Sequence, residues 1–342
     1  MRTEAKSVKI CIIGAGSWGT ALSLLLAEKG NDVRFWAKEP EIVDNINRHH
    51  HNGVYLPDVQ LPETITAYTD MNDALNGADI VVFATPSHTI REVAGRAKSH
   101  LKGTERVVSV SKGIEMDTFL TMSQLLAEVL EGVISDDQIG VLSGPSHAEE
   151  VSRRMPTTVV SSSNSKKTAL IIQDLFMTPA FRVYVNRDII GVEVSGAVKN
   201  IMAIAAGIGD GADLGDNAKA ALITRGLAEM RRLGMRLGAS QETFAGLTGV
   251  GDLIVTCTSR HSRNRSVGFR IGKGEKMRDI TKSMAMVAEG VKTTRSVHKW
   301  AKTLNVNMPI TDKVYQVLFE DLPPLDAVHD LMTRDPKEEI VY

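Results

Sequence analysis

The sequence predicts an α/β protein in two parts, with alternating strands and helices in the N-terminal part and helices alone in the C-terminal part. Short, apolar, β-branched runs alternate with helix-like segments as far as residue 188, and we find no such run after it. A glycine-rich turn follows the first run directly. This change of pattern predicts two domains, residues 1–188 and residues 189–342, as the length of 342 residues also favours.

The composition is that of a soluble globular protein, with 43% hydrophobic and 24% charged residues. A net charge of −1 gives no basic field for nucleic acid or an anionic membrane, so neither partner is expected. The two cysteines, Cys11 and Cys257, lie in apolar runs and favour reduced thiols in a cytoplasmic protein. No membrane span is expected, because glycines interrupt residues 10–27 and no other run approaches about 20 apolar residues.

The first elements are a strand at 8–13, a glycine-rich turn, a helix at 20–29 and a strand at 32–36. The turn has the spacing G-x-G-x-x-G of dinucleotide-binding proteins, and its position between strand and helix is the context that this motif requires. Gly14 makes the tight turn, Gly16 lets a pyrophosphate approach the backbone, and Gly19 lets the helix pack on the strand. The free N–H groups of the helix N-terminus would face the phosphates.

The end of the second strand indicates which nicotinamide cofactor is used. An acidic residue there would bind the ribose hydroxyl of NAD, whereas a cation would meet the 2′-phosphate of NADP. The sequence places Lys38 and Glu39 at this point, which leans towards NADP while leaving NAD open. A solvated charged turn is the alternative interpretation.

The alternation continues along the N-terminal part. Helices are predicted at 40–48 and 88–98, and strands at 80–84, 106–110, 139–143, 157–161 and 181–185. The histidine run at 49–51 does not indicate a metal site, because adjacent residues on one loop rarely converge on one ion and no Cys or carboxylate cluster joins them.

Two of these strands end in residues that suit a ligand, since ligands bind at the carboxyl ends of such strands. Lys112 follows the strand at 106–110 and is predicted to lie near a phosphate or carbonyl, with a surface turn as the alternative. Ser146 follows the strand at 139–143 and is predicted to be a helix N-cap, with Glu149 in the capping box. A ligand contact by Ser146 is also open.

The helical part begins with a helix at 191–207 that is apolar or small all round and is therefore expected to be buried. Lys199 and Asn200 lie in its middle. A buried lysine is costly unless it is paired or functional, so Lys199 is a candidate catalytic residue. A snorkelling lysine or one paired with an acid is the structural alternative.

A glycine-rich loop at 207–217 is predicted next, followed by helices at 218–234, 253–256, 267–271 and 310–321, by one that follows Glu289, and by a last one after Pro324. Asp252 is either an N-cap or a catalytic residue. Ser262, Arg263 and Asn264 precede a helix and make a candidate phosphate site, because arginine binds phosphate oxygens with two donors.

Together these segments resemble the soluble, bacterial-type NAD(P)-dependent glycerol-3-phosphate dehydrogenases. The matching stretches span most of the chain and are residues 14–21, 111–113, 143–146, 191–200, 222–226, 249–253, 262–265 and 287–290. The resemblance implies a Rossmann-type domain, a helical domain, and an active site between them. It implies reversible hydride transfer from NAD(P)H to dihydroxyacetone phosphate, giving sn-glycerol 3-phosphate for phospholipid synthesis.

The resemblance also assigns roles to residues. Lys199 would be the acid/base, and Asp252 is the second catalytic candidate because it can orient Lys199. The cofactor contacts would be Gly14, Gly16, Ser17, Trp18, Gly19, Lys38, Lys112, Ala148, Arg263, Val287 and Glu289. The substrate contacts would be Lys112, Gly144, Ser146, Lys199, Asp252, Ser262, Arg263 and Asn264. His147 stands where members of the family often carry Phe.

The residues agree with that chemistry. Hydride addition to a ketone develops an alkoxide, which needs a cation and a proton donor, and a buried lysine with a lowered pKa supplies both. No metal is required, NADPH is expected to serve at least as well as NADH, and a homodimer is a candidate assembly. The alternatives are a related phospho-hydroxyacid dehydrogenase with the same two-domain plan and a non-catalytic NAD(P)-sensing protein.

Overall fold

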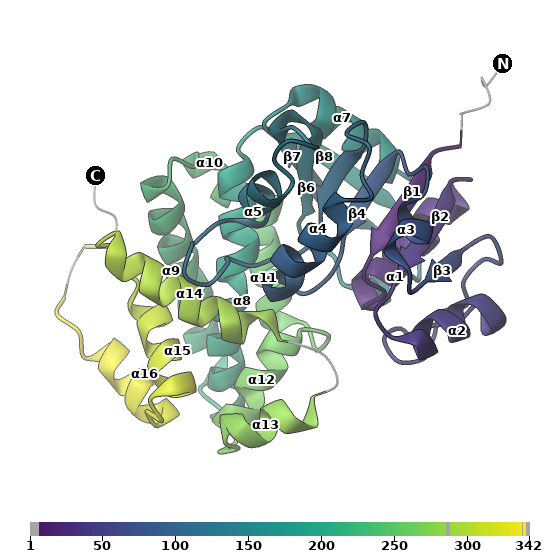
Figure 1. Cartoon of the computed structure of the whole chain (residues 1–342). Helices are drawn as coiled ribbons and strands as arrows, with labels where there is room; N and C mark the ends of the chain where they lie inside the picture. The colour runs from purple at the N-terminus through teal and green to yellow at the C-terminus, as the bar shows by residue number, and fades with distance from the viewer. Residues whose placement is uncertain (1–6, 285–287, 337, 340–342) are drawn as a thin grey trace.

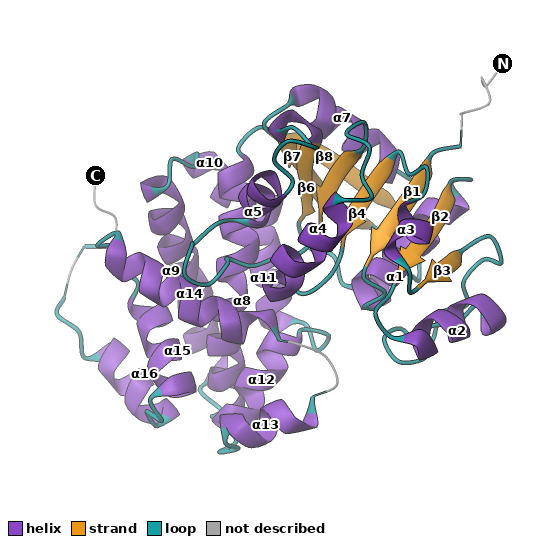
Figure 2. Cartoon of the chain, in the orientation of Figure 1, coloured by secondary structure: helices purple, strands orange, loops and turns teal. Residues whose placement is uncertain are grey.

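The computed structural model describes residues 7–284, 288–336 and 338–339 and contains one eight-stranded sheet (Figures 1 and 2). The strand order is β3-β2-β1-β4-β5-β6-β7-β8. The strands are β1 (Lys9–Ile13), β2 (Asp32–Trp36), β3 (Thr66–Tyr68), β4 (Ile80–Phe83), β5 (Arg106–Ser109), β6 (Ile139–Ser143), β7 (Thr157–Ser163) and β8 (Phe181–Asn186). All of them precede residue 188, as the sequence predicts.

The first six strands run parallel in the order 3-2-1-4-5-6, which is the Rossmann order. The strand order reverses between β1 and β4, so a crevice opens at their carboxyl ends, where the glycine-rich turn lies. β7 pairs antiparallel with β6, and β8 then runs parallel to β7. β4 and β6 are buried along their whole length and β1 along all but its first residue, as expected for parallel strands with helices over both faces.

Helices cover the sheet on two sides, and the side chains of β1 show the division. Ile10 and Ile12 pack in one apolar cluster with α1, α2 and α7, whereas Cys11 and Ile13 pack in another with α3, α4 and α5. Both cysteines of the chain are buried and free. The helices of this part are α1 (Ser17–Glu28), α2 (Pro40–His49), α3 (Met71–Leu75), α4 (Ile90–Lys98), α5 (Met122–Val129), α6 (Ala148–Val151) and α7 (Lys166–Phe176).

After β8 the described residues form helices, with α8 at their centre (Figure 2). Asp188 caps α8 by accepting a hydrogen bond from the Gly191 amide at 2.9 Å. α9, α11, α12 and α14 pack around α8. The helices of this part are α8 (Ile189–Gly211), α9 (Gly215–Arg236), α10 (Gln241–Phe244), α11 (Asp252–Thr258), α12 (Arg263–Gly272), α13 (Met277–Ser283), α14 (Glu289–Thr303), α15 (Pro309–Phe319) and α16 (Pro324–Met332). A π-helical turn, Leu247–Gly251, precedes α11.

Helices α8 and α12 touch backbone to backbone through glycines. A Cβ atom on Gly207 would lie 2.0 Å from the Arg265 carbonyl oxygen, and one on Gly268 would lie 2.0 Å from that of Ile204. Gly211 and Gly272 repeat this arrangement one turn further along their helices, at 2.2 Å from Phe269 O and 2.4 Å from Ile208 O. The contact fixes α12 beside the C-terminal turns of α8.

Two expectations about α8 were wrong. The predicted glycine-rich loop at 207–217 is shorter, because α8 continues to Gly211 and α9 begins at Gly215; the glycines there serve helix packing. The expectation that no other run approaches the length of a membrane span fails for α8, which is long and apolar enough by length and composition. In this fold, however, 89% of its apolar window is buried, as in the core helix of a soluble protein.

Candidate functional site

A cavity of ≈ 520 Å³ lies at the carboxyl ends of the strands and extends to α8, α11 and α12. The predicted site residues that line it are Gly14, Gly16, Ser17, Trp18, Lys38, Lys112, Ser146, Ala148, Lys199, Asp252, Ser262, Arg263, Asn264 and Glu289. Gly19 and Gly144 contact lining residues, since Gly19 packs against Gly14 and Gly144 O accepts a hydrogen bond from Lys112. Val287 lies outside the described residues. Residues more than 250 positions apart in the sequence therefore share one cavity.

The glycine-rich turn has the geometry that its three glycines predict. Gly14 has φ of +112°, and a Cβ on it would lie 2.9 Å from Thr85 Cγ2. A Cβ on Gly19 would lie 2.2 Å from the Gly14 carbonyl oxygen, whereas one on Gly16 would meet no atom within 4 Å. Turn and helix packing thus require Gly14 and Gly19, and the space at Gly16 is open for a ligand. α1 begins at Ser17 with no side chain capping its first amides.

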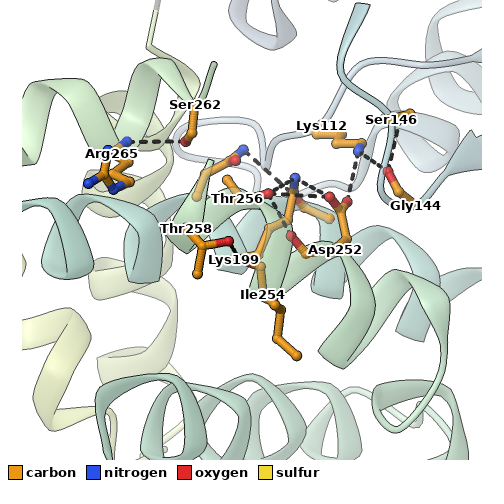
Figure 3. Close-up of polar contacts among 12 residues, drawn as sticks. Lys112, Gly144, Ser146, Lys199, Asp252, Ile254, Thr256, Thr258, Ser262 and Arg265 are labelled. Atoms are coloured by element: carbon orange, nitrogen blue, oxygen red, sulfur yellow. Dashed lines mark hydrogen bonds and ion pairs between the residues drawn. The ribbon is translucent and has the colours of Figure 1, made fainter. Parts of the chain in front are cut away.

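Lys199 lies in the middle of α8 and is only 6% exposed. Its Nζ donates to Asp252 Oδ1 at 2.5 Å and to Thr256 Oγ1 at 2.6 Å, as Figure 3 shows. Thr256 lies one turn after Asp252 on α11, so the two side chains share the face of that helix that meets α8. This threonine was missed from the sequence, although its i+4 spacing from Asp252 could have indicated it.

Lys112 reaches the same carboxylate from the sheet side of the cavity. Its Nζ donates to Asp252 Oδ2 at 2.8 Å and to the Gly144 carbonyl oxygen at 3.0 Å (Figure 3). Gly196 makes room for it, because a Cβ there would lie 3.5 Å from Lys112 Cγ and 3.0 Å from Ser143 Oγ. Asp252, 1% exposed, therefore joins two lysine ammonium groups that come from different parts of the fold.

The electrostatics of this group favour an easily lost proton on Lys199. Burial lowers the Lys199 pKa to about 8, the neighbouring Lys112 charge acts in the same direction, and Asp252 opposes both. Burial alone would raise the pKa of Asp252, but the two lysines outweigh it and hold that pKa below its usual range. Lys199 is thus a buried ammonium beside a carboxylate that stays ionised.

Two structural interpretations of the sequence were wrong. Asp252 is not an N-cap, because Gly251 precedes the first residue of α11 and the carboxylate is bound to the lysines. Ser146 is not the N-cap of α6 either; His147 occupies that position, and Ser146 Oγ donates to Gly144 O at 2.9 Å. Both side chains instead face the cavity.

The candidate phosphate site lies at the N-terminus of α12. Ser262 caps this helix by accepting from the Arg265 amide at 3.2 Å, and Arg263 follows as an exposed residue at the cavity wall. Asn264 Oδ1 accepts from the Gly290 amide at 2.9 Å and so ties α12 to α14. A cation, a helix N-terminus and polar side chains lie here within reach of one anion.

Glu289 links α14 to the loop after β4. Its carboxylate accepts the Ser87 amide at 3.0 Å and the Ser87 hydroxyl, a contact across 202 positions of sequence that could not be predicted. Burial raises the pKa of Glu289, and these hydrogen bonds partly offset that rise. Lys38 and Glu39 line the cavity just after the end of β2, and Trp36, Tyr55 and Arg96 line the same cavity.

In the described parts of the chain, no three His, Cys, Asp or Glu side chains are grouped so as to hold a metal ion. Within the histidine run, His51 Nε2 lies 2.6 Å from the Pro57 carbonyl oxygen.

Comparison with known proteins identifies the family of the chain. Residues 9–169 match the model of the NAD-dependent glycerol-3-phosphate dehydrogenase N-terminus, and residues 188–329 match that of the C-terminus. A glycerol-3-phosphate dehydrogenase [NAD(P)+] of Chlorobium phaeobacteroides (strain BS1) is 52% identical over 335 residues, covering 98% of this chain and 100% of that protein. The enzyme of the same name from Geobacillus thermodenitrificans (strain NG80-2) is 54% identical over 332 residues, covering 97% of this chain and 96% of that protein.

A solved structure extends the comparison to the fold. The crystal structure of glycerol-3-phosphate dehydrogenase from Coxiella burnetii superposes with a TM-score of 0.92 at 41% identity, covering 96% of this chain and 99% of that one. With a glycine-rich turn, a buried lysine and a helix N-terminus around one cavity, and with matches over nearly its whole length, the chain belongs to the NAD-dependent glycerol-3-phosphate dehydrogenase family.

Proposed function

We propose that this protein catalyses reversible hydride transfer between NAD(P)H and dihydroxyacetone phosphate, giving sn-glycerol 3-phosphate. Its family makes it an NAD(P)-dependent oxidoreductase acting on a CH–OH group. The observation that carries the substrate proposal is Lys199, buried between Asp252 and Thr256 in the same cavity as the glycine-rich turn and the α12 N-terminus. We propose residues 1–188 as the cofactor domain and residues 189–342 as the substrate domain.

The residues of the glycine-rich turn fit a dinucleotide, since the space at Gly16 and the uncapped amides of α1 suit a pyrophosphate. NAD(P)H, when bound, supplies the hydride. Ser17, Trp18 and Ala148 would line its path from the turn towards Lys199, and Lys38 would meet its adenosine end. The resemblance implies that Val287 and Glu289 also contact the cofactor. Glu289 would in addition hold the loop after β4 in place through its hydrogen bond with Ser87.

Lys199 is the candidate general acid and base. When the carbonyl carbon of the substrate accepts hydride, its oxygen becomes an alkoxide and takes a proton from Lys199 Nζ. In the reverse direction, neutral Lys199 removes the proton from the hydroxyl as hydride leaves. Asp252 holds the ammonium in position and stabilises its charge, and Thr256 Oγ1 accepts a second hydrogen bond from the same nitrogen. A pKa of about 8 lets the group serve both directions near neutral pH.

The substrate would be held at both ends. Ser262, Arg263 and Asn264 would bind its phosphate, because the dianion needs a fixed cation and N–H donors. Lys112, Gly144 and Ser146 would contact the three-carbon backbone from the sheet side, which places the carbonyl group near Lys199. We place the enzyme in the cytoplasm, in the supply of sn-glycerol 3-phosphate for phospholipid synthesis, and propose a homodimer as its assembly.

The test is the loss of nicotinamide absorbance when purified protein receives dihydroxyacetone phosphate and either NADH or NADPH, with no added metal. We expect turnover with both cofactors and none when the phosphate is absent from the substrate. Turnover that a chelator abolishes would contradict the metal-free mechanism. Absence of turnover with both cofactors would contradict the proposed reaction.

A further inference from the structure

The part of the cavity wall that β2 and α4 form contains an arginine stacked on a fixed tryptophan. The guanidinium carbon of Arg96, on α4, lies 5.0 Å from the centre of the Trp36 ring. Trp36 ends β2 and is 3% exposed, and its indole Nε1 donates to the Thr69 carbonyl oxygen at 2.9 Å. The ring is therefore a rigid support that holds the guanidinium plane in place.

This pair lies beside the glycine-rich turn. The Gly14 amide donates to the Trp36 carbonyl oxygen at 2.9 Å, so the end of β2 and the turn are one hydrogen-bonded unit. Trp36, Lys38 and Arg96 all line the cavity that contains Gly14 and Gly16. A dinucleotide with its pyrophosphate at the turn would extend its adenosine half towards these three side chains.

The positively charged side chain of Arg96 is accessible to a ligand. It is exposed, and within residues 7–284, 288–336 and 338–339 no carboxylate lies within ion-pair distance of it. Glu39 and Glu92 also line this end of the cavity, so its net charge is close to balanced and Lys38 alone would leave a phosphate dianion poorly compensated. A planar guanidinium can bind two phosphate oxygens at once, which a lysine cannot do.

We propose that Arg96 is a cofactor-specificity residue: held over Trp36, it binds the 2′-phosphate of NADPH together with Lys38 and thereby sets the preference for NADPH over NADH. This inference rests on the proposed use of NAD(P)H. It extends the contact predicted at Lys38 to a residue of another element, which no motif in the sequence indicates.

The experiment compares two probes that lack nicotinamide, 2′,5′-ADP and 5′-AMP, on the full-length protein by calorimetric titration. In Arg96→Gln we expect the affinity for 2′,5′-ADP to fall about 10- to 100-fold, while that for 5′-AMP changes less than about 3-fold. The ratio of kcat/KM for NADPH to that for NADH should fall by a similar factor. Arg96→Lys should recover only part of both, because it keeps the charge and loses the fork.

A matched control is Arg182→Gln, since the Arg182 guanidinium lies 4.9 Å from the Tyr184 ring but neither residue lines the cavity. This variant should bind both probes as the unaltered protein does. Equal losses for the two probes in Arg96→Gln, or no loss for either, would overturn the proposal. Phosphate-selective, Arg96-dependent binding in a protein that does not turn over dihydroxyacetone phosphate would support this inference while contradicting the proposed reaction.

Discussion

The two ends of the cavity differ in the burial and pairing of their charged side chains. At the inner end, Lys199 and Asp252 are 6% and 1% exposed, and each charged atom has a partner within 2.8 Å. At the outer end, which β2 and α4 line, Lys38 and Arg96 are exposed, and no carboxylate of the described residues pairs with them. A buried charge is costly unless it is paired, whereas an exposed cation is solvated without a protein partner and can bind a ligand. A substitution at the inner end should therefore affect chemistry, and one at the outer end should affect selectivity.

The strongest test of this comparison is Lys199→Met, which keeps the apolar stem and removes the charge. We expect kcat to fall by at least about 10²–10⁴-fold, because the proton donor is lost. The protein should stay folded and bind NADPH, because Lys112 still neutralises Asp252 and the glycine-rich turn is untouched. The measurements are steady-state kinetics, cofactor titration and the melting temperature.

Lys299→Met is the control for Lys199→Met, since Lys299 is an exposed lysine paired with Asp117 at 2.9 Å. It should leave kcat unchanged. A stable Lys199→Met protein with normal kcat would refute the mechanism.

Arg263→Ala tests whether the exposed arginine at the N-terminus of α12 binds the substrate. Loss of a charge-assisted phosphate contact should cost about 2–3 kcal/mol of transition-state binding, or roughly 30- to 150-fold in kcat/KM. The effect should fall mainly on KM for dihydroxyacetone phosphate, with little change in melting temperature. Near-normal KM for this substrate would remove Arg263 from the phosphate site.

The pH dependence sharpens the comparison, because burial lowers the pKa of Lys199 at the inner end. Ketone reduction needs protonated Lys199, so its rate should fall as pH rises through about 8, and alcohol oxidation should rise over the same range. In Asp252→Asn the carboxylate that raises the Lys199 pKa is gone, so both limbs should move to lower pH. If the pH–rate profiles of this variant do not shift, a group other than Lys199 causes the change in rate near pH 8.

Lys38→Ala should have the smallest effect, because the side chain is solvent-exposed and its charge is screened. We expect the preference for NADPH over NADH, measured as the ratio of kcat/KM values, to fall about 3- to 10-fold with kcat for NADH intact. If the ratio is unchanged, the 2′-phosphate is not bound at Lys38.

The sequence predicted most strands and helices, because their patterns are local, but it missed β3 and the helices α3, α5 and α7. β2 and β6 begin and end at the predicted residues, and Gly14 has the positive φ that the motif implies. The sequence did not show whether a polar side chain bonds to its neighbours in sequence or to distant residues. Asp252 looked like a cap because its neighbours in sequence suit one, whereas its actual partners are lysines 53 and 140 positions away. The stacking of Arg96 on Trp36 likewise exists only in the folded chain.

The packing of α8 has a consequence for how the protein is made. This helix leaves the ribosome before the helices α9, α11, α12 and α14 that bury it, and roughly ninety residues separate Gly211 from Thr303 at the end of the last of them. At about 5–20 residues per second, the nascent chain exposes a segment with the length and composition of a membrane span for roughly 5–20 s. The segment that carries Lys199 therefore stays without its packing partners until α14 has been synthesised.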